Sequence, residues 1–350
     1  MKKVIIFCLI ILFFTKTQNV FGATRVFAVD NILVTGELNN NNYRQKYSEI
    51  AFRKGFQKLV VGIVRQKDQK TLFSTDIKTI KSLVSSYKII KENIRDNTYE
   101  LELGITFDRK LVERFLQKKN ISYSDLKKLN ILVYPILIVD SEIQVLSKNK
   151  FFEEWNNDDE ALENISFIMP VQNLDDIDFI KKNLSDLEEK NLSTLVDNYE
   201  IKNSTILILR YDEKKLNVFL KTNLAGTNKV KQIDFGLENL ENIKAREQII
   251  LKLKYYISEV WKEENLIDIS TPSYLTVNTK IDNKTSLKEI IEIIKKISLI
   301  ENYSVEQLDK HSAKIKIKFF GKIKNLQERL IENGFEFKIL HDEWNLYLKI

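Results

Sequence analysis

The hydrophobic pattern of the chain begins with an unbroken apolar run, residues 4–14, directly after two lysines. A polar stretch follows and ends at Gly22, and this order of segments is typical of a secretory signal peptide. The run is shorter than the roughly 20 residues that a membrane span requires, so a retained anchor is the less favoured alternative. We expect cleavage after Gly22, because Gly22 and Val20 are small enough for a signal peptidase. The pattern therefore predicts an exported, periplasmic protein with no transmembrane segment once residues 1–22 are removed.

Residues 23–127 change between the two-residue period of strands and the four-residue spacing of a helical face. Small residues at Ala51 and Gly55 favour close packing of the helix on a sheet. Asp108 is a suitable N-cap for a second helix. The expected elements are a strand over 25–35, a helix from 43 to about 63, paired strands over 84–94 and 99–107, and a helix that begins at Asp108. This order predicts an N-terminal β-α-β-β-α domain.

Residues 128–268 begin with an apolar run, 131–139, whose length and branching favour a central buried strand. Pro135 lies within that run and favours an edge, a bulge or a strand end. The other expected elements are helices over 151–163 and, with interruptions, 175–199, strands over 165–169, 204–210, 216–222 and 229–234, and a long amphipathic helix from about 240 to 264. These elements predict a central α/β domain with a closing helix.

Residues 269–350 follow a β-α-β-β-α-β order, with two short strands expected about Asp342 and Glu343 at its end, and this order is the ferredoxin-like arrangement. No segment rich in Pro and Gly separates the three regions. The fold class predicted for the chain is therefore mixed, α/β and α+β, with three small modules that pack against one another.

Composition narrows the possible chemistry. The formal charge of the whole chain is +6. Removing Lys2, Lys3 and Lys16 with the signal leaves +3, and most basic residues are Lys rather than Arg, so nucleic-acid binding is disfavoured. The single cysteine, Cys8, lies in the signal, which excludes thiol chemistry. Common nucleotide-binding and nucleophile motifs are absent, and we expect no cofactor, no metal and no catalytic residue.

Two groups of residues are candidates for binding. Asn173, Asp175, Asp176 and Asp178 could coordinate a cation or act as acid and base. Carboxylates in the first turn of a helix also interact favourably with the helix dipole, and we favour this capping role. Trp155 lies among Glu153, Glu154, Asp158, Asp159 and Glu160, where an exposed tryptophan would anchor a partner. We favour the alternative, a tryptophan that covers a core edge.

Several stretches of the chain carry a resemblance to a known family. They are Ala51 with Gly55, the strand pair ending in Ile105-Thr106-Phe107-Asp108, Ile131-Leu132-Val133-Tyr134-Pro135, Phe151-Phe152-Glu153-Glu154-Trp155, Met169-Pro170 followed by Leu174-Asp175-Asp176, and the strand from Ala313 to Gly321. Together these stretches resemble a family of exported proteobacterial proteins that is known as domain of unknown function 2066. Two departures occur: Gln172 and Asn173 stand where a Gly-Asp pair is usual, and Phe152 stands where a tryptophan is usual. The resemblance implies an envelope protein of a Gram-negative bacterium and brings no known activity.

The central domain is also similar in element order to the N-terminal domain of the translocation protein TolB, which is a likeness of fold and does not fix function. Two functional hypotheses follow. The favoured one is a non-enzymatic periplasmic interaction or adaptor protein with an envelope protein as its partner. The alternative is a carboxylate-dependent enzyme or a small-ligand-binding protein that uses Asn173, Asp175 and Asp176.

Overall fold

The N-terminal module, residues 26–125, is built on an antiparallel three-stranded sheet. The computed structural model describes residues 26–38, 42–125, 129–144, 148–155, 162, 165–171, 173–224, 226–281, 286–340 and 342–349. In the sheet, β3 (Thr98–Asp108) lies between β1 (Val26–Glu37) and β2 (Val84–Arg95). Helix α2 (Tyr43–Ile63) packs over β1 and β3. Gly55 permits this approach, because a Cβ there would lie 2.7 Å from Cδ1 of Ile105.

Three further helices complete this module. Two of them, α3 (Gln66–Phe73) and α4 (Ile77–Leu83), are not indicated by the hydrophobic pattern. Helix α5 (Arg109–Lys118) begins as predicted, because the carboxylate of Asp108 accepts a hydrogen bond from the backbone N–H of Leu111 at 3.0 Å. The β-α-β-β-α order is thus confirmed, with α3 and α4 added.

The central module, residues 129–268, has a six-stranded mixed sheet. Strands β10 (Thr227–Gly236), β9 (Lys215–Leu224), β8 (Ser204–Asp212), β5 (Leu129–Val139) and β6 (Glu142–Gln144) lie in that order, and β7 (Ile165–Ile168) also pairs with β5. Helices α6 (Lys150–Glu154) and α8 (Ile243–Glu264) cover one face, and α7 (Leu174–Lys182) with the turns after it covers the other. The region from 183 to 199 contains turns and a short 3-10 helix, Ser193–Leu195, so the helix expected there ends at Lys182.

Pro135 lies in the middle of the central strand β5, which corrects the expectation of an edge, bulge or strand end. Along its full length from Leu132 to Val139, β5 pairs with β8 on one side. On the other side β7 pairs only with 129–132 and β6 only with 137–139. Pro135 falls in the gap between them, where its missing N–H leaves no partner unsatisfied, and its carbonyl accepts a hydrogen bond from Nδ2 of Asn149 at 3.0 Å.

The C-terminal module, residues 269–349, has the predicted β-α-β-β-α-β order, and two strands follow its last helix as expected. Its sheet order is β13 (Ile300–Leu308), β14 (Ser312–Phe319), β12 (Ser273–Lys280), β16 (Glu343–Leu348) and β15 (Phe335–Leu340). Helices α9 (Leu287–Ile294) and α10 (Ile323–Glu332) connect the strands. Strand β16 lies between β12 and β15 and runs parallel to β12, so the final strand is inserted into an otherwise ferredoxin-like sheet.

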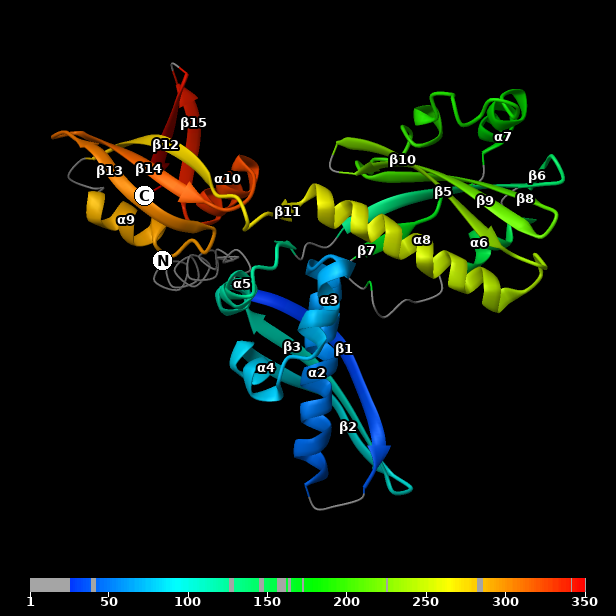
Figure 1. Cartoon of the computed structure of the whole chain (residues 1–350), viewed down its shortest axis with the longest axis horizontal. Coiled ribbons are helices and arrows are strands. Elements are labelled where there is room, and N and C mark those ends of the chain that lie inside the picture. Colours follow the sequence, from blue (N-terminus) through cyan, green and yellow to red (C-terminus); the bar gives the residue numbers. More distant parts are fainter. Residues whose placement is uncertain are drawn as a thin grey trace, which may run out of the picture.

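The modules meet around a short two-stranded ladder between β4 (Tyr123–Ser124) and β11 (Leu266–Ile267) (Figure 1). One apolar cluster is continuous from the N-terminal module through Tyr123 and Ile267 into the C-terminal module. The prediction of several small packed modules with mixed α and β structure is confirmed. No helix in the part of the chain that the structure describes has the length and apolar character of a membrane span.

Candidate functional site

Strand β2 is an exposed edge strand. Among the described elements it pairs only with β3, and α2 lies mainly over β1 and β3, reaching β2 through Phe52 and Arg44. Every β2 residue from Ser85 to Glu92 is exposed. The N-terminal module extends away from the other two modules, so β2 is remote from the module junction along most of its length (Figure 1). A long edge of this kind is a template for pairing with another strand.

The side of β2 that faces the α2 layer is apolar. Residues directly opposite in an antiparallel ladder share a face, and Tyr87, Ile89 and Ile94 lie opposite Ile105, Leu103 and Tyr99, which are buried beneath α2. Tyr87, Ile89 and Ile94 are themselves 55%, 51% and 52% exposed. Part of the Tyr87 ring packs edge-on against Phe52, with centroids 5.2 Å apart. The result is an apolar stripe on a free sheet edge, beyond the cover of the helix.

A polar anchor interrupts that stripe at Glu92. Its carboxylate accepts hydrogen bonds from the hydroxyl of Tyr99 at 2.7 Å and from Nε of Arg44 at 2.8 Å. Burial and the neighbouring carboxylate raise the pKa of Tyr99 to about 12, so this hydroxyl remains a donor. The contact fixes the start of α2 to the middle of β2 and leaves the apolar residues on either side open.

The opposite side of β2 carries positive charge. In the register of the two strands, Lys88, Lys91 and Arg95 of β2 lie opposite Gly104, Glu102 and Thr98 of β3. Their side chains therefore project away from α2. Lys91 forms an ion pair with Glu100 at 2.9 Å. Neither Lys88 nor Arg95 forms an ion pair within the described residues. The bulge at Ile90 places this residue on the same side, where its Cδ1 lies 3.7 Å from the position of a Cβ on Gly104.

Charge is distributed unevenly among the modules. Residues 26–125 contain 18 Lys and Arg against 12 Asp and Glu, a net charge of +6. Residues 129–268 contain 17 against 26, a net of −9, and residues 269–349 contain 14 against 11, a net of +3. The near-neutral total thus conceals a basic N-terminal module, and β2 lies in that module.

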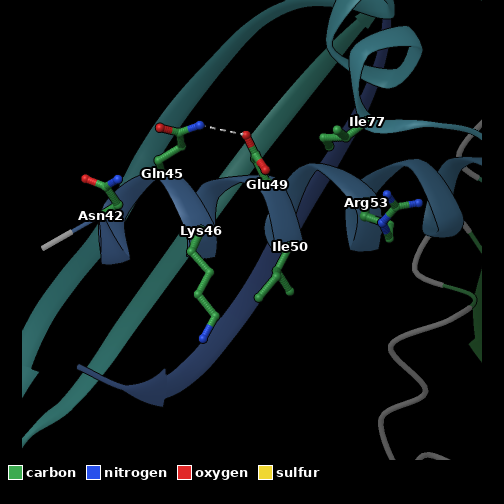
Figure 2. Close-up of a pocket in the computed structure, with 7 residues that line it drawn as sticks. All are labelled: Asn42, Gln45, Lys46, Glu49, Ile50, Arg53 and Ile77. Atoms are coloured by element: carbon green, nitrogen blue, oxygen red, sulfur yellow. Dashed lines mark hydrogen bonds between the residues drawn. The ribbon is translucent and has the colours of Figure 1, made fainter. Parts of the chain in front are cut away.

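A shallow hollow of about 500 Å³ runs along the outer side of α2 (Figure 2). Its lining combines Ile50 and Ile77 with polar side chains that already have partners. Glu49 accepts hydrogen bonds from Gln45 at 3.1 Å and Lys81 at 2.8 Å, and Arg53 donates to the carbonyl of Thr75 at 2.9 Å. These contacts hold α4 against α2 and lower the pKa of Glu49. The polar groups in the hollow thus have structural partners of their own.

The sequence-predicted binding residues do not form one site. Trp155 is completely buried in the central core, with its ring edge-on to Phe167 at 6.0 Å, so the prediction of an exposed anchor is wrong. The ion pair of Glu154 with Arg246 lies beside it and is itself largely buried. Asp158, Asp159 and Glu160 lie outside the described residues. The favoured interpretation, a tryptophan that packs with the core, agrees with the structure.

Asn173, Asp175 and Asp176 adopt the capping role rather than a shared site. The side chain of Asn173 accepts a hydrogen bond from the backbone N–H of Asp175 at 3.0 Å and caps α7. Asp175 is exposed, whereas Asp176 is buried and accepts a hydrogen bond from the hydroxyl of Tyr134 at 3.0 Å. Burial raises the pKa of Asp176 despite this bond. The two carboxylates therefore have different surroundings, and this helix start does not have the shared acid–base cluster that was the less favoured hypothesis.

A buried ionic cluster joins the N-terminal and C-terminal modules. Glu113 of α5 is fully buried, accepts a hydrogen bond from Ser298 and lies 3.4 Å from Nη2 of Arg329 in α10. Arg329 also contacts Asp125 at 3.3 Å, and Asp125 pairs with Arg109 at 2.9 Å. Arg329 also pairs with Glu332 of its own helix at 3.2 Å, so the two arginines of the junction contact three carboxylates. The sequence alone did not indicate this cluster, because its members are up to 216 positions apart.

Replacing Glu113 with Gln tests the electrostatics of this junction. Burial raises the pKa of Glu113, against the opposing effects of Arg329 and Ser298. A carboxyl with a raised pKa in the folded state contributes stability that is complete below its ordinary pKa of about 4.3 and is lost as pH rises through the raised value. Measured by denaturant unfolding, wild type should therefore gain stability relative to Glu113→Gln as pH falls from neutral towards the ordinary pKa of a glutamate.

The matched control is Glu336→Gln. Lys338 lowers the pKa of this exposed carboxyl, so wild type should lose a little stability relative to the control variant as pH falls. The contrary result is a difference in free energy of unfolding between wild type and Glu113→Gln that stays constant with pH, or that changes in the same direction as for the control. Either result would show that the pKa of Glu113 is not raised and that the junction holds this carboxylate charged.

Comparison with known proteins gives no match: no family model fits the chain and no curated protein is similar to it. The resemblance to domain of unknown function 2066 stays a prediction. The structure therefore defines a mixed α/β protein of several small packed modules, and the candidate site rests on β2 alone.

Proposed function

We propose that this chain is an exported, periplasmic interaction or adaptor protein that docks an envelope protein partner without catalysing a reaction. The observation that carries the proposal is the β2 edge strand with its half-exposed Tyr87, Ile89 and Ile94. Solvent-exposed apolar side chains on an unpaired edge destabilise a soluble protein through aggregation unless a partner covers them. The signal-like residues 1–22 and the TolB-like order of elements in the central module support the compartment and the role.

Affinity capture from intact envelopes tests this function. The tagged mature protein is cross-linked in living cells and purified, and proteins that co-purify in near-stoichiometric amount are identified. Replacing Ile89 with Asp places a charge in the middle of the apolar stripe, and we expect the recovery of the partner to fall about fivefold or more. Because Ile89 is half-exposed, stability should change by only about 0.5 kcal/mol.

Val230→Asp is the control, since Val230 is 57% exposed on the edge strand β10 of the central module. Its recovery of the partner should equal that of wild type. The intact mass of the recovered chain reports on export, because cleavage after Gly22 leaves Ala23 at the N-terminus. Recovery of the chain alone, or equal loss with both variants, would contradict the proposed docking surface.

A further inference from the structure

The two sides of β2 define the chemistry of the segment that it binds. A strand added to this edge would place alternate side chains on opposite faces of the sheet. On the α2 side they would lie beside Tyr87, Ile89 and Ile94, where apolar side chains are favoured. On the other side they would lie beside Lys88, Lys91 and Arg95, where carboxylates are favoured.

We propose that β2 binds an extended segment of a partner protein in which β-branched or aromatic residues alternate with Asp or Glu. The segment extends the three-stranded sheet by one strand, a recognition mode in which main-chain hydrogen bonds supply affinity and alternate side chains supply specificity. This inference rests on the proposed function and adds to it the sequence pattern of the partner.

Charge complementarity favours such a partner over a second copy of the chain. The outermost strand carries Lys88, Lys91 and Arg95 against the single acid Glu92, which is already held by Arg44 and Tyr99. The surrounding module has a net charge of +6. Pairing β2 with itself would bring two such basic modules together, and like charges across an interface oppose association. An acidic strand removes that repulsion and pairs with Lys88 and Arg95, which form no ion pair within the described residues.

Strands β10 and β13, two other edges of the molecule, fit this pattern less well. Strand β10 has one exposed large apolar residue, Val230, and its Lys229 is already paired with Glu263 and Glu264 at 2.8 Å. On β13 the apolar exposure is limited to Val305 and Leu308, near its end. On β14, next to it, Lys316 and Lys318 pair with Glu306 and Glu301 of β13. Only β2, among these described strands, combines an apolar stripe with unpaired cations on the opposite side.

A defined peptide pair tests the inference on the full mature chain. One labelled peptide of about ten residues alternates Val with Glu, and its partner alternates Val with Lys. Fluorescence anisotropy in about 50 mM salt, where surface charges are weakly screened, should show that the Val/Glu peptide binds about tenfold or more tightly. Hydrogen exchange should then slow in residues 84–95 and not in β10 or β13, because the peptide occupies the backbone groups of β2.

The charge-reversed variant Lys88→Glu with Arg95→Glu should lose about tenfold in affinity for the Val/Glu peptide and gain affinity for the Val/Lys peptide. Lys231→Glu on the exposed edge β10 is the matched control and should change neither. Equal binding of both peptides, slowed exchange outside β2, or the same loss with the control would overturn the inference. So would a dimer that slows exchange in β2 without peptide, since the occupant would then be a second copy.

The peptide and capture experiments fail separately. If envelope capture depends on Ile89 but β2 shows no preference for the acidic peptide, docking at β2 stands and the acidic pattern is wrong. If the peptide binds as expected but no envelope protein is captured, the chemistry of the edge stands and the adaptor function is wrong.

Discussion

Replacing Arg329 with Met should lower the free energy of unfolding by about 3–5 kcal/mol at pH 7. Arg329 is nearly fully buried at the junction, where it lies 3.4 Å from a carboxylate oxygen of Glu113 and 3.3 Å from one of Asp125. Methionine fills a similar length of side chain but leaves Glu113 without its cation in a site with no access to water. An uncompensated buried charge costs far more than the ion pair contributes, and this asymmetry sets the size of the effect.

Denaturant unfolding of the mature protein measures this loss, and Lys338→Met is the control. Lys338 pairs with Glu336 at 2.9 Å, a distance no longer than those at the junction, but the two side chains are 52% and 42% exposed. An exposed pair contributes about 0–1 kcal/mol. If the two variants were equally stable, the junction cluster would have to be hydrated in solution and the two modules would not be locked together by it.

The double variant Arg329→Met with Glu113→Gln separates charge from packing. It removes the buried carboxylate together with its cation, so it should recover part of the stability lost by Arg329→Met. Recovery identifies the unpaired charge as the cause. A loss that persists in full would place the cost in the packing of α10 against α5.

The predictable part of the fold is the part governed by local periodicity. The four-residue spacing from Tyr43 to Ile63 and the alternation over 99–107 correspond to α2 and β3. Asp108 caps α5 as expected, since the hydrogen bond of a cap to its own helix involves residues three positions apart. Short helices such as α3 and α4 were not indicated, because eight residues or fewer do not show a clear helical face.

The unpredictable part depends on which residues become neighbours in space. Pro135 is tolerated in a central strand because its two flanking partners, β6 and β7, stop on either side of it. The acids around Trp155 suggested an exposed tryptophan, yet Glu154 is drawn to Arg246 of α8, 92 positions away. Likewise, the sequence of β2 predicts a strand but does not indicate that the strand is exposed. It is exposed because α2 lies mainly over the other two strands. The pattern of residues along the sequence does not indicate which strands the helix covers.

Replacing Trp155 with Ala should destabilise the protein by about 3–5 kcal/mol, because it removes a fully buried indole and leaves a cavity in the central core. The ring packs against Phe167 and belongs to the same apolar cluster as Leu137, Leu207 and Leu253. Denaturant unfolding measures the loss. Leu174→Ala is the control: Leu174 is 74% exposed at the start of α7, so its removal should change stability by about 0.5 kcal/mol or less.

The conservative variant Trp155→Phe distinguishes a core role from a binding role. Phenylalanine keeps most of the buried ring and removes an indole N–H that forms no hydrogen bond within the described residues, so the loss should be only about 1.5 kcal/mol or less. Because the ring is inaccessible, envelope capture should be unchanged by Trp155→Phe under conditions where the variant is folded. A tryptophan that anchored a partner would behave in the opposite way, since its truncation would reduce capture while leaving the free energy of unfolding near that of wild type. The two measurements on one variant thus decide between the core position that the structure shows and the exposed anchor that the acidic sequence around it suggested.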